Sequence, residues 1–189
     1  MIPCLTTERL FLRPFTPDDV DAILAIYGDR EANTFLPWFP VKSREEAAAL
    51  YESRYARPEG YRWAVCLKAD DVPIGYVHVS AGDSRDLGYG LRHEYWNRGL
   101  MTEACRAVLP QLAREGLPFV TATHDVKNPA SGAVMRKLGM RYCYSYIEQW
   151  QPKNISVTFR MYQLNLDGRD DRVYRKYWEQ YPDHFIEAL

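Results

Sequence analysis

Two segments of the chain combine residue types and spacing that suit the binding of a phosphate-bearing ligand. In the first, a strand-like run, LGYGLR, leads through Trp96-Asn97-Arg98-Gly99 into a helical pattern. Gly99 allows the backbone to approach a bulky anion closely, and the free N–H groups of a first helical turn bind phosphate. Arg98 adds a cation at the same place. A simple strand-to-helix turn also favours Asn and Gly, so this turn alone leaves both interpretations open.

The second segment begins a helix with Asn128-Pro129 and continues to Gly139. Asn128 is a favourable N-cap and Pro129 a favourable first helical residue, so helix-start chemistry alone explains both. Ser131 lies in the first turn of this helix. Its hydroxyl either points toward a ligand or forms a local bond to the backbone.

Composition excludes several classes of function. Lys and Arg total 24 against 25 Asp and Glu, so there is no basic field to hold nucleic acid. The cysteines form no CxxC pair and no His is spaced for zinc, which argues against a metal site and favours a reducing cytosol. No apolar run approaches ~18 residues, and the amino end lacks a signal pattern. We expect a cytoplasmic protein without a membrane, nucleic-acid or metal partner.

The pattern of elements predicts a single mixed α+β domain. The expected order is β-α-α-β-β-β-α-β-α-β-β, and a crossover helix in a central β-α-β unit predicts a parallel, right-handed strand pair. The expected strands are residues 10–15, 61–68, 72–80, 86–92, 119–123, 140–150 and 155–166. The expected helices are residues 17–28, 44–57, 98–115, 129–139 and 173–180. We expect residues 1–166 to form the domain, and the charged, aromatic tail 167–189 to be partly helical and packed on it.

Taken together, the motifs resemble those of the GNAT superfamily of N-acetyltransferases. Trp96-Asn97-Arg98-Gly99-Leu100-Met101-Thr102-Glu103-Ala104 resembles the family's acetyl-CoA loop, and Asn128-Pro129-Ala130-Ser131 with Lys137-Leu138-Gly139-Met140 resembles the motif that follows. The opening Thr7-Glu8-Arg9-Leu10 with Leu12-Arg13 is similar to the start of the RimJ/RimL-like branch, which acetylates the N-termini of ribosomal proteins. The resemblance spans about residues 7–166.

The resemblance implies a mostly antiparallel mixed sheet with a central splayed parallel pair, flanked by helices, and the pantetheine arm of acetyl-CoA in the gap. It implies that backbone groups of Tyr89, Gly90 and Leu91 pair with the arm. Asn128 would bond the pantetheine, and Ser131 would lie near the sulfur. The residues whose N–H groups would hold the pyrophosphate, with help from the Arg98 side chain, are Asn97, Arg98, Gly99, Leu100, Met101 and Thr102.

The chain departs from the family pattern at two places. The loop positions that are commonly Arg or Gln, Gly, and Gly or Ala are Trp96, Gly99 and Met101 here. Many members carry a tyrosine proton donor at the position of Met135, which cannot donate. Serine at the position of Ser131 is the usual substitute in the RimJ/RimL-like branch.

The implied reaction is direct transfer of acetyl from acetyl-CoA to a primary amine, either a peptide or protein N-terminus or a small amine, in a ternary complex. We expect Ser131 to act as acid, and the base to be His78 or Glu94. Monomer and homodimer both stay open. The alternatives are a non-catalytic CoA-binding sensor or scaffold and a nucleotide-binding protein; the missing GxxxxGK[ST] pattern argues against the latter.

Overall fold

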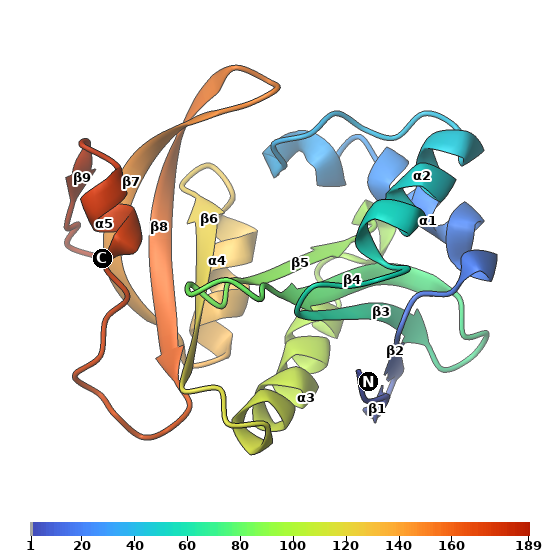
Figure 1. Cartoon of the computed structure of the whole chain (residues 1–189), viewed down its shortest axis with the longest axis horizontal. Helices are drawn as coiled ribbons and strands as arrows, with labels where there is room; N and C mark the ends of the chain where they lie inside the picture. The colour runs from blue at the N-terminus through green and yellow to red at the C-terminus, as the bar shows by residue number, and fades with distance from the viewer. Residues whose placement is uncertain (1) are drawn as a thin grey trace.

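Two antiparallel sheets stand side by side in the computed structural model, which describes residues 2–189 (Figure 1). The first sheet has the order β1-β2-β3-β4-β5 and the second the order β6-β8-β7-β9. The strands of the first sheet are β1 (Leu5–Thr6), β2 (Leu10–Arg13), β3 (Tyr61–Leu67), β4 (Pro73–Val79) and β5 (Leu87–Leu91). Those of the second are β6 (Phe119–Asp125), β7 (Arg141–Trp150), β8 (Ile155–Asn165) and β9 (His184–Phe185).

Five α-helices and three short 3₁₀ turns complete the described chain. The helices are α1 (Val20–Gly28), α2 (Arg44–Arg54), α3 (Leu100–Arg114), α4 (Pro129–Lys137) and α5 (Lys176–Gln180). The turns are η1 (Pro17–Asp19), η2 (Ala32–Phe35) and η3 (His93–Tyr95). No helix within residues 2–189 is long and apolar enough to cross a membrane.

The helix starts follow the capping signals of the sequence. Asn128 accepts a hydrogen bond from the N–H of Ser131 at the start of α4, and Ser43 accepts one from Glu46 at the start of α2. Helix α3 begins two residues later than expected. Asn97 and Gly99 have φ angles of 60° and 74°, which are left-handed and cannot belong to a right-handed helix.

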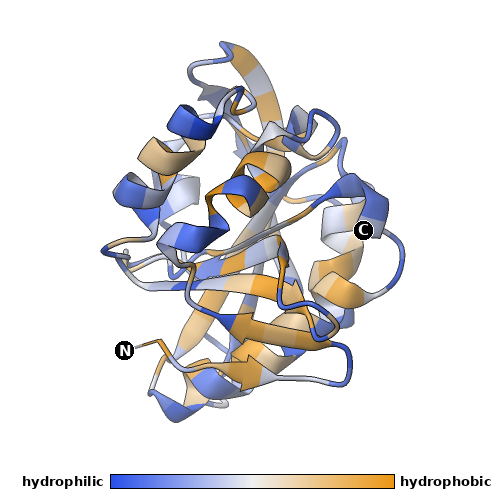
Figure 2. Ribbon diagram, turned by 90° about the vertical axis from the view of Figure 1, so that its right-hand side faces the viewer, coloured by the Kyte–Doolittle hydropathy of each residue, from blue (hydrophilic) through white to orange (hydrophobic). Residues whose placement is uncertain are grey.

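The helices cover the first sheet on its two faces. Helix α3 packs on one face, around the fully buried Trp63, Val77 and Val108, and α4 lies beside α3 and packs against β6 of the second sheet. Helices α1 and α2 pack on the other face, against Tyr76 and its neighbours. Hydrophobic colour accordingly follows the strands and the inward sides of the helices in Figure 2.

The expected α+β fold is confirmed, but the expected single mixed sheet with a central, splayed parallel β-α-β pair is not: the strands form two antiparallel sheets. Strands β5 and β6, which α3 connects, belong to different antiparallel sheets. Within residues 2–189 they share a single parallel bridge, between Asp86 and Thr121, and no ladder continues from it. Each strand instead has a full antiparallel ladder on its other edge, β5 with β4 and β6 with β8. The crossover therefore brings the strands together at one end only.

The tail lies against the second sheet. Strand β9 pairs with β7, and the hydroxyl of Tyr144 in β7 donates to the C=O of Tyr174, 2.7 Å away. Two side chains of the tail, Tyr177 and Trp178, pack on the aromatic cluster of β7 and β8. The expected division of the chain at residue 166 stays a prediction, because these contacts do not show whether residues 1–166 fold alone.

Candidate active site

Strand β5 has an edge whose backbone groups are not used by β4. The N–H of Arg92 donates to the C=O of Ile74 at 3.0 Å, and Gly90 is paired with Tyr76. Residues alternate in an antiparallel ladder, so the even-numbered residues of β5 bond to β4 and the odd-numbered ones turn their N–H and C=O groups away from it. The odd-numbered residues are Leu87, Tyr89 and Leu91.

Strand β6 presents the matching edge. The N–H of Val126 donates to the C=O of Thr158 at 2.9 Å, so the even-numbered residues of β6 bond to β8 and Thr123 faces β5. The two edges meet at the Asp86–Thr121 bridge. From this bridge toward their C-terminal ends, β5 and β6 face each other without a ladder. We call these two facing edges the β5–β6 seam. Backbone donors and acceptors that face each other without a ladder can bond an extended ligand laid between them.

The loop after β5 turns a row of N–H groups outward. None of the N–H groups of residues 97–102 donates to another group of the described chain, and the first donor of α3 is Glu103, which bonds the C=O of Gly99 at 3.0 Å. Asn97, Arg98 and Gly99 are exposed. Free amides at the start of a helix form an anion site, especially where left-handed residues curve the loop around it.

Trp96 closes the end of the seam nearest this loop. Its indole Nε1 donates to the C=O of Leu91 at 2.7 Å. The tryptophan at a position where the family commonly has Arg or Gln therefore bonds the protein's own backbone. The C=O of Leu91 is thereby used, while its N–H stays on the seam edge.

Glu103 holds the start of α3 against the first sheet through a hydrogen bond and an ion pair. Its carboxylate accepts from the hydroxyl of Thr7 and pairs with Arg9 at 2.6 Å, and Arg9 also donates to the C=O of Arg98 at 2.9 Å. Partial burial opposes ionisation of Glu103, but these hydrogen bonds lower its pKa. The opening Thr-Glu-Arg motif of the chain therefore positions the loop at residues 97–102, which we call the anion loop.

Ser131 lies across the seam from β5. The hydroxyl of Tyr89 donates to the C=O of Ser131 at 2.9 Å and lies 3.2 Å from its Oγ. Asn128 Oδ1 accepts from the N–H of Ser131 at 3.2 Å, which leaves the amide NH₂ of Asn128 for another partner. Burial raises the pKa of Tyr89, so its phenol stays protonated at neutral pH. The structure thus brings Tyr89, Asn128 and Ser131 together.

His78 lies on the opposite face of the first sheet from Tyr89. It pairs with Gly88 in the β4–β5 ladder, and a Cβ at position 88 would clash with Cε1 of the His78 ring. Only glycine leaves room for this ring. Burial, followed by the nearby charges of Arg62 and Arg54, lowers the pKa of His78 to about 4. The imidazole is therefore neutral at pH 7.

Glu94 is not brought to Ser131. It lies on the exposed turn η3, at the carboxyl end of β5, and pairs with Arg92 at 2.5 Å. Together with His93 and Asp29 it lines a pocket of about 560 Å³ between α1 and η3. The ring of His93 pairs with Asp29 at 2.8 Å, so this pocket has its own polar network.

Asp86 is a candidate residue that sequence reasoning missed. It lies at the bridge where β5 and β6 part, and alternation along β5 places it on the face of Gly88 and His78. Its Oδ1 is buried and has no partner in the described chain. Burial raises the pKa of Asp86 to about 7. No sequence signal marks it, because an Asp before a strand is typical of an exposed turn.

Within the described residues, no cluster of three His, Cys, Asp or Glu side chains is arranged to hold a metal ion.

The unpaired seam and the free amides at the start of α3 stand on a two-sheet α+β fold, and the match of the sequence to a family of known activity shows that the chain is an acyltransferase. Residues 9–141 match the family described as "Acetyltransferase (GNAT) domain", and the chain therefore belongs to the GNAT family of N-acetyltransferases, in its RimJ/RimL-like group. Its cosubstrate is acetyl-CoA, which the enzymes of this family use.

Relatives agree with this assignment. The chain is 28% identical over 149 residues to the uncharacterized N-acetyltransferase YoaA of Bacillus subtilis, covering 75% of this chain and 84% of the relative. A GNAT-family acetyltransferase structure from Bacillus anthracis aligns with a TM-score of 0.77 at 22% identity, covering 87% of this chain and 99% of that one. RimL, a ribosomal L7/L12 α-N-protein acetyltransferase solved with coenzyme A, aligns with a TM-score of 0.76 at 19% identity, covering 88% and 100%. These two likenesses show the fold.

Proposed function

We propose that this enzyme transfers acetyl from acetyl-CoA to a primary amine, a peptide or protein N-terminus or a small amine, by direct attack in a ternary complex. The observation that carries the proposal is the row of free N–H groups at residues 97–102, at the end of an unpaired seam. A diphosphate on an extended arm fits this combination, because the anion takes the helix-start amides while the arm takes the strand edges.

The residues that would hold acetyl-CoA follow from the direction of their free groups. The N–H and C=O of Tyr89 and the N–H of Leu91 face the seam and would pair with the pantetheine. The backbone groups of Gly90 pair with β4, so we remove Gly90 from the expected contacts. Asn128 would donate its side-chain NH₂ to the arm. The proposed pyrophosphate contacts are the N–H groups of Asn97, Arg98, Gly99, Leu100, Met101 and Thr102, with the Arg98 guanidinium.

In the proposed reaction, the neutral amine nitrogen forms a bond to the thioester carbonyl carbon and the carbon–sulfur bond breaks. The amine gives up one proton to a base on the protein, and Ser131 Oγ supplies one proton to the departing sulfur. Ser131 regains its proton from solvent, and the base releases its own there, so acetylated amine and free CoA are the only products. Alignment of the two reactants would supply much of the acceleration.

Three residues compete for the role of base. Glu94 faces the pocket between α1 and η3, at the end of β5 away from the Asp86 bridge. His78 is close to β5 but, with a pKa of about 4, takes up a proton weakly at neutral pH. Asp86 combines a buried, unpartnered oxygen with a pKa of about 7, which suits proton transfer near neutrality. We propose Asp86 ahead of His78, and His78 ahead of Glu94.

The competing function is a CoA-binding sensor or scaffold without turnover. Isothermal titration with acetyl-CoA, followed by a thiol-release assay over a panel of peptides and small amines, separates the two. We expect binding in the micromolar range and release of CoA with at least one amine. Binding without release from any amine would favour the sensor, and absence of binding would refute both. We further propose that residues 1–166 carry the activity and that residues 167–189 support them.

A further inference from the structure

Two arginines on the His78 face of the first sheet, Arg62 and Arg54, have no acidic partner within residues 2–189. Arg62 lies on β3 directly opposite His78, and its Nε is buried without a hydrogen-bond partner. Arg54 ends α2, and its guanidinium lies over the ring of Trp38, 4.2 Å from the centroid. Within residues 2–189 neither arginine takes part in an ion pair. A buried guanidinium donor without an acceptor calls for an acceptor from outside the chain.

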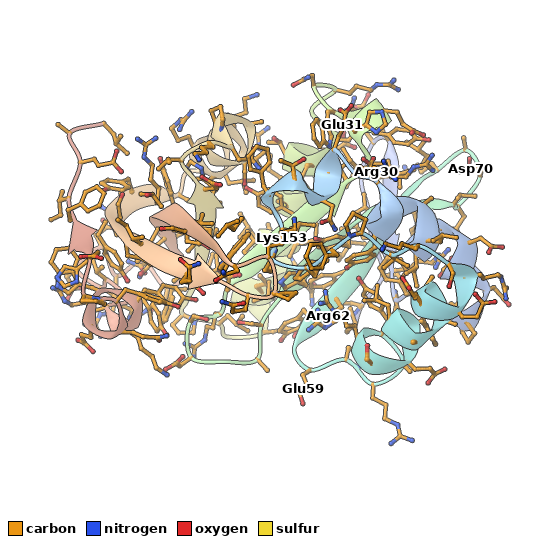
Figure 3. The ribbon with its side chains drawn as sticks, turned by 90° about the horizontal axis from the view of Figure 1, so that it is seen from above. Arg30, Glu31, Glu59, Arg62, Asp70 and Lys153 are labelled. Atoms are coloured by element: carbon orange, nitrogen blue, oxygen red, sulfur yellow. The ribbon has the colours of Figure 1, made fainter. Side chains whose placement is uncertain are left out.

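A third cation lies on the same side of the molecule. Lys153, in the turn between β7 and β8, donates to the C=O and the side-chain oxygen of Asn33 at 2.8 and 3.2 Å. Both acceptors are neutral, so this charge also has no acidic partner there. Figure 3 shows Arg62 and Lys153 from above, on the side where the β7–β8 turn approaches η2.

The arginines are within reach of the seam. Arg62, His78 and Gly88 form one row across β3, β4 and β5, and side chains paired in this way share a face. Neighbouring strands are ~4.8 Å apart, so the row spans about 10 Å. Arg54 lies over the rings of Tyr27 and Trp38, and Tyr27 stacks on Tyr76, which in turn stacks on His78, so this aromatic row links Arg54 to the same face. A molecule with its amine at the seam and an anionic group a few bonds away would meet them.

We propose that the acceptor carries a carboxylate close to the amine, and that Arg62 and Arg54 bind this carboxylate. The proposal rests on the proposed transferase function and names its substrate class. A carboxylate matches the planar fork of a guanidinium and would satisfy the buried Nε of Arg62. The carboxylate has two sources: a free amino acid, or an acidic residue near the N-terminus of a peptide.

The test compares matched acceptors that differ only in charge. One pair is a short peptide with Asp at its second position and the same peptide with Asn. The other is glutamine, which carries one α-carboxylate, and its α-amide, glutamine amide, which carries none. With saturating acetyl-CoA, we expect one acidic acceptor to exceed its neutral isostere about 10- to 100-fold in kcat/KM. The pair that shows the difference identifies the source of the carboxylate.

Variants assign the effect to the arginines. Arg62→Gln should raise the KM for the acidic acceptor at least about 10-fold, while kcat/KM for the neutral isostere stays within about twofold. Arg62→Lys should recover part of the preference, because the charge stays and the fork is lost. Arg57→Gln, an exposed arginine just beyond α2, is the control and should change neither value. Calorimetry with acetyl-CoA checks that each variant is folded.

Two outcomes would overturn the inference: equal use of acidic and neutral acceptors by the unaltered enzyme, or an Arg62→Gln variant that loses both acceptors equally while acetyl-CoA still binds. Failure of the proposed function looks different. In that case the unaltered enzyme would bind no acetyl-CoA, or would release no CoA with any amine, and the inference would be refuted with it.

Discussion

Ser131 is the residue whose surroundings best define a chemical role. Its N–H bonds Asn128 and its C=O accepts from the phenol of Tyr89, so both backbone groups are held. The hydroxyl lies 3.2 Å from the same phenol. A serine hydroxyl is a weak acid, and its use as a proton donor therefore depends on where it is held rather than on its own pKa.

We expect Ser131→Ala to lower kcat about 100-fold, because the departing sulfur loses its proton donor. The dissociation constant of acetyl-CoA, measured by calorimetry, should change by less than about threefold. Tyr89→Phe removes only the hydroxyl group beside Ser131 and keeps the ring, so it should lower kcat less than Ser131→Ala does. Equal kcat for Ser131→Ala and the unaltered enzyme would contradict the assigned role.

Asp86 leads to a prediction about the pH dependence of the rate. If it is the base, kcat/KM should rise with pH and bend near pH 7, where its carboxyl ionises. Asp86→Asn should lower kcat/KM about 100-fold and remove this bend, in a pH series with an amine of low pKa. Asp18→Asn, an exposed acid at the start of η1, is the control. A variant at position 86 that keeps the bend would argue for His78.

The same carboxyl should affect stability. Its pKa is raised from 3.8 to about 7 on folding, so the folded state binds the proton more tightly. Its favourable contribution is full below about pH 4 and disappears as the pH rises through 7, with an upper limit of about 4 kcal/mol. Urea unfolding at pH 5 and pH 8 should show Asp86→Asn gaining stability relative to the unaltered enzyme at the higher pH. An unchanged difference would mean that Asp86 is solvated.

The individual site residues differ in how far sequence could reveal them. Asn128, Ser131 and the loop at residues 97–102 belong to motifs with recognisable helix-start chemistry. Asp86 and Arg62 carry no such signal, because their importance comes from burial in the folded protein. Glu94 was expected on its nearness to the strand in sequence, but the turn η3 directs it to another pocket.

At the scale of elements, the junction between β5 and α3 depends on a left-handed glycine. Gly99 has a φ of 74° and precedes the free amides of α3. Gly139, after α4, has a φ of 80°, and no atom lies within 4 Å of the point where a methyl group would be added. It therefore offers a matched site of the same strain away from the loop.

Gly99→Ala and Gly139→Ala should each destabilise the fold by about 1–2 kcal/mol in urea unfolding, because alanine is strained in this conformation. Only Gly99→Ala should also weaken acetyl-CoA binding, by about 10-fold or more, since its strain shifts the amides that face the diphosphate. Equal affinity of both variants for acetyl-CoA would contradict the assignment of the anion loop.

Most long helices and strands could be predicted from the sequence. The separation of β5 from β6 could not. Caps at Ser43 and Asn128 and the apolar runs of the strands locate the elements. Strands β1 and β9 were missed, because two residues paired through their backbones leave no hydrophobic pattern. The crossover rule correctly makes β5 and β6 neighbours, but it does not say that they part after one bridge.

At the scale of the molecule, the tail joins the two sheets. Its aromatic side chains cover the cluster of β7 and β8, which includes Tyr146 and Phe159. Tyr174 and Lys176 also bond Asp83, in the loop between β4 and β5, at 2.9 and 3.0 Å. This loop leads directly to Asp86, so the tail supports both the second sheet and the end of the seam.

We expect removal of residues 171–189 to lower Tm by about 10 °C or more, because several aromatic side chains lose their cover. Thermal unfolding followed by circular dichroism measures this. Ile186→Ala is the control, because that side chain is 72% exposed and should leave Tm nearly unchanged. A truncated chain with the original Tm would show that the domain folds without its tail.

Strand β9 is short, but it pairs with the outer edge of the long strand β7. Without β9, the backbone groups on that edge would be unpaired. It bonds β7 at Ser145 and Tyr146, and the C=O of Asp183 accepts from Ile147 at 2.9 Å. An uncovered outer strand offers a row of donors and acceptors on which other chains can stack and aggregate. Because β9 pairs with the middle of β7, we expect it to limit such self-association at high concentration.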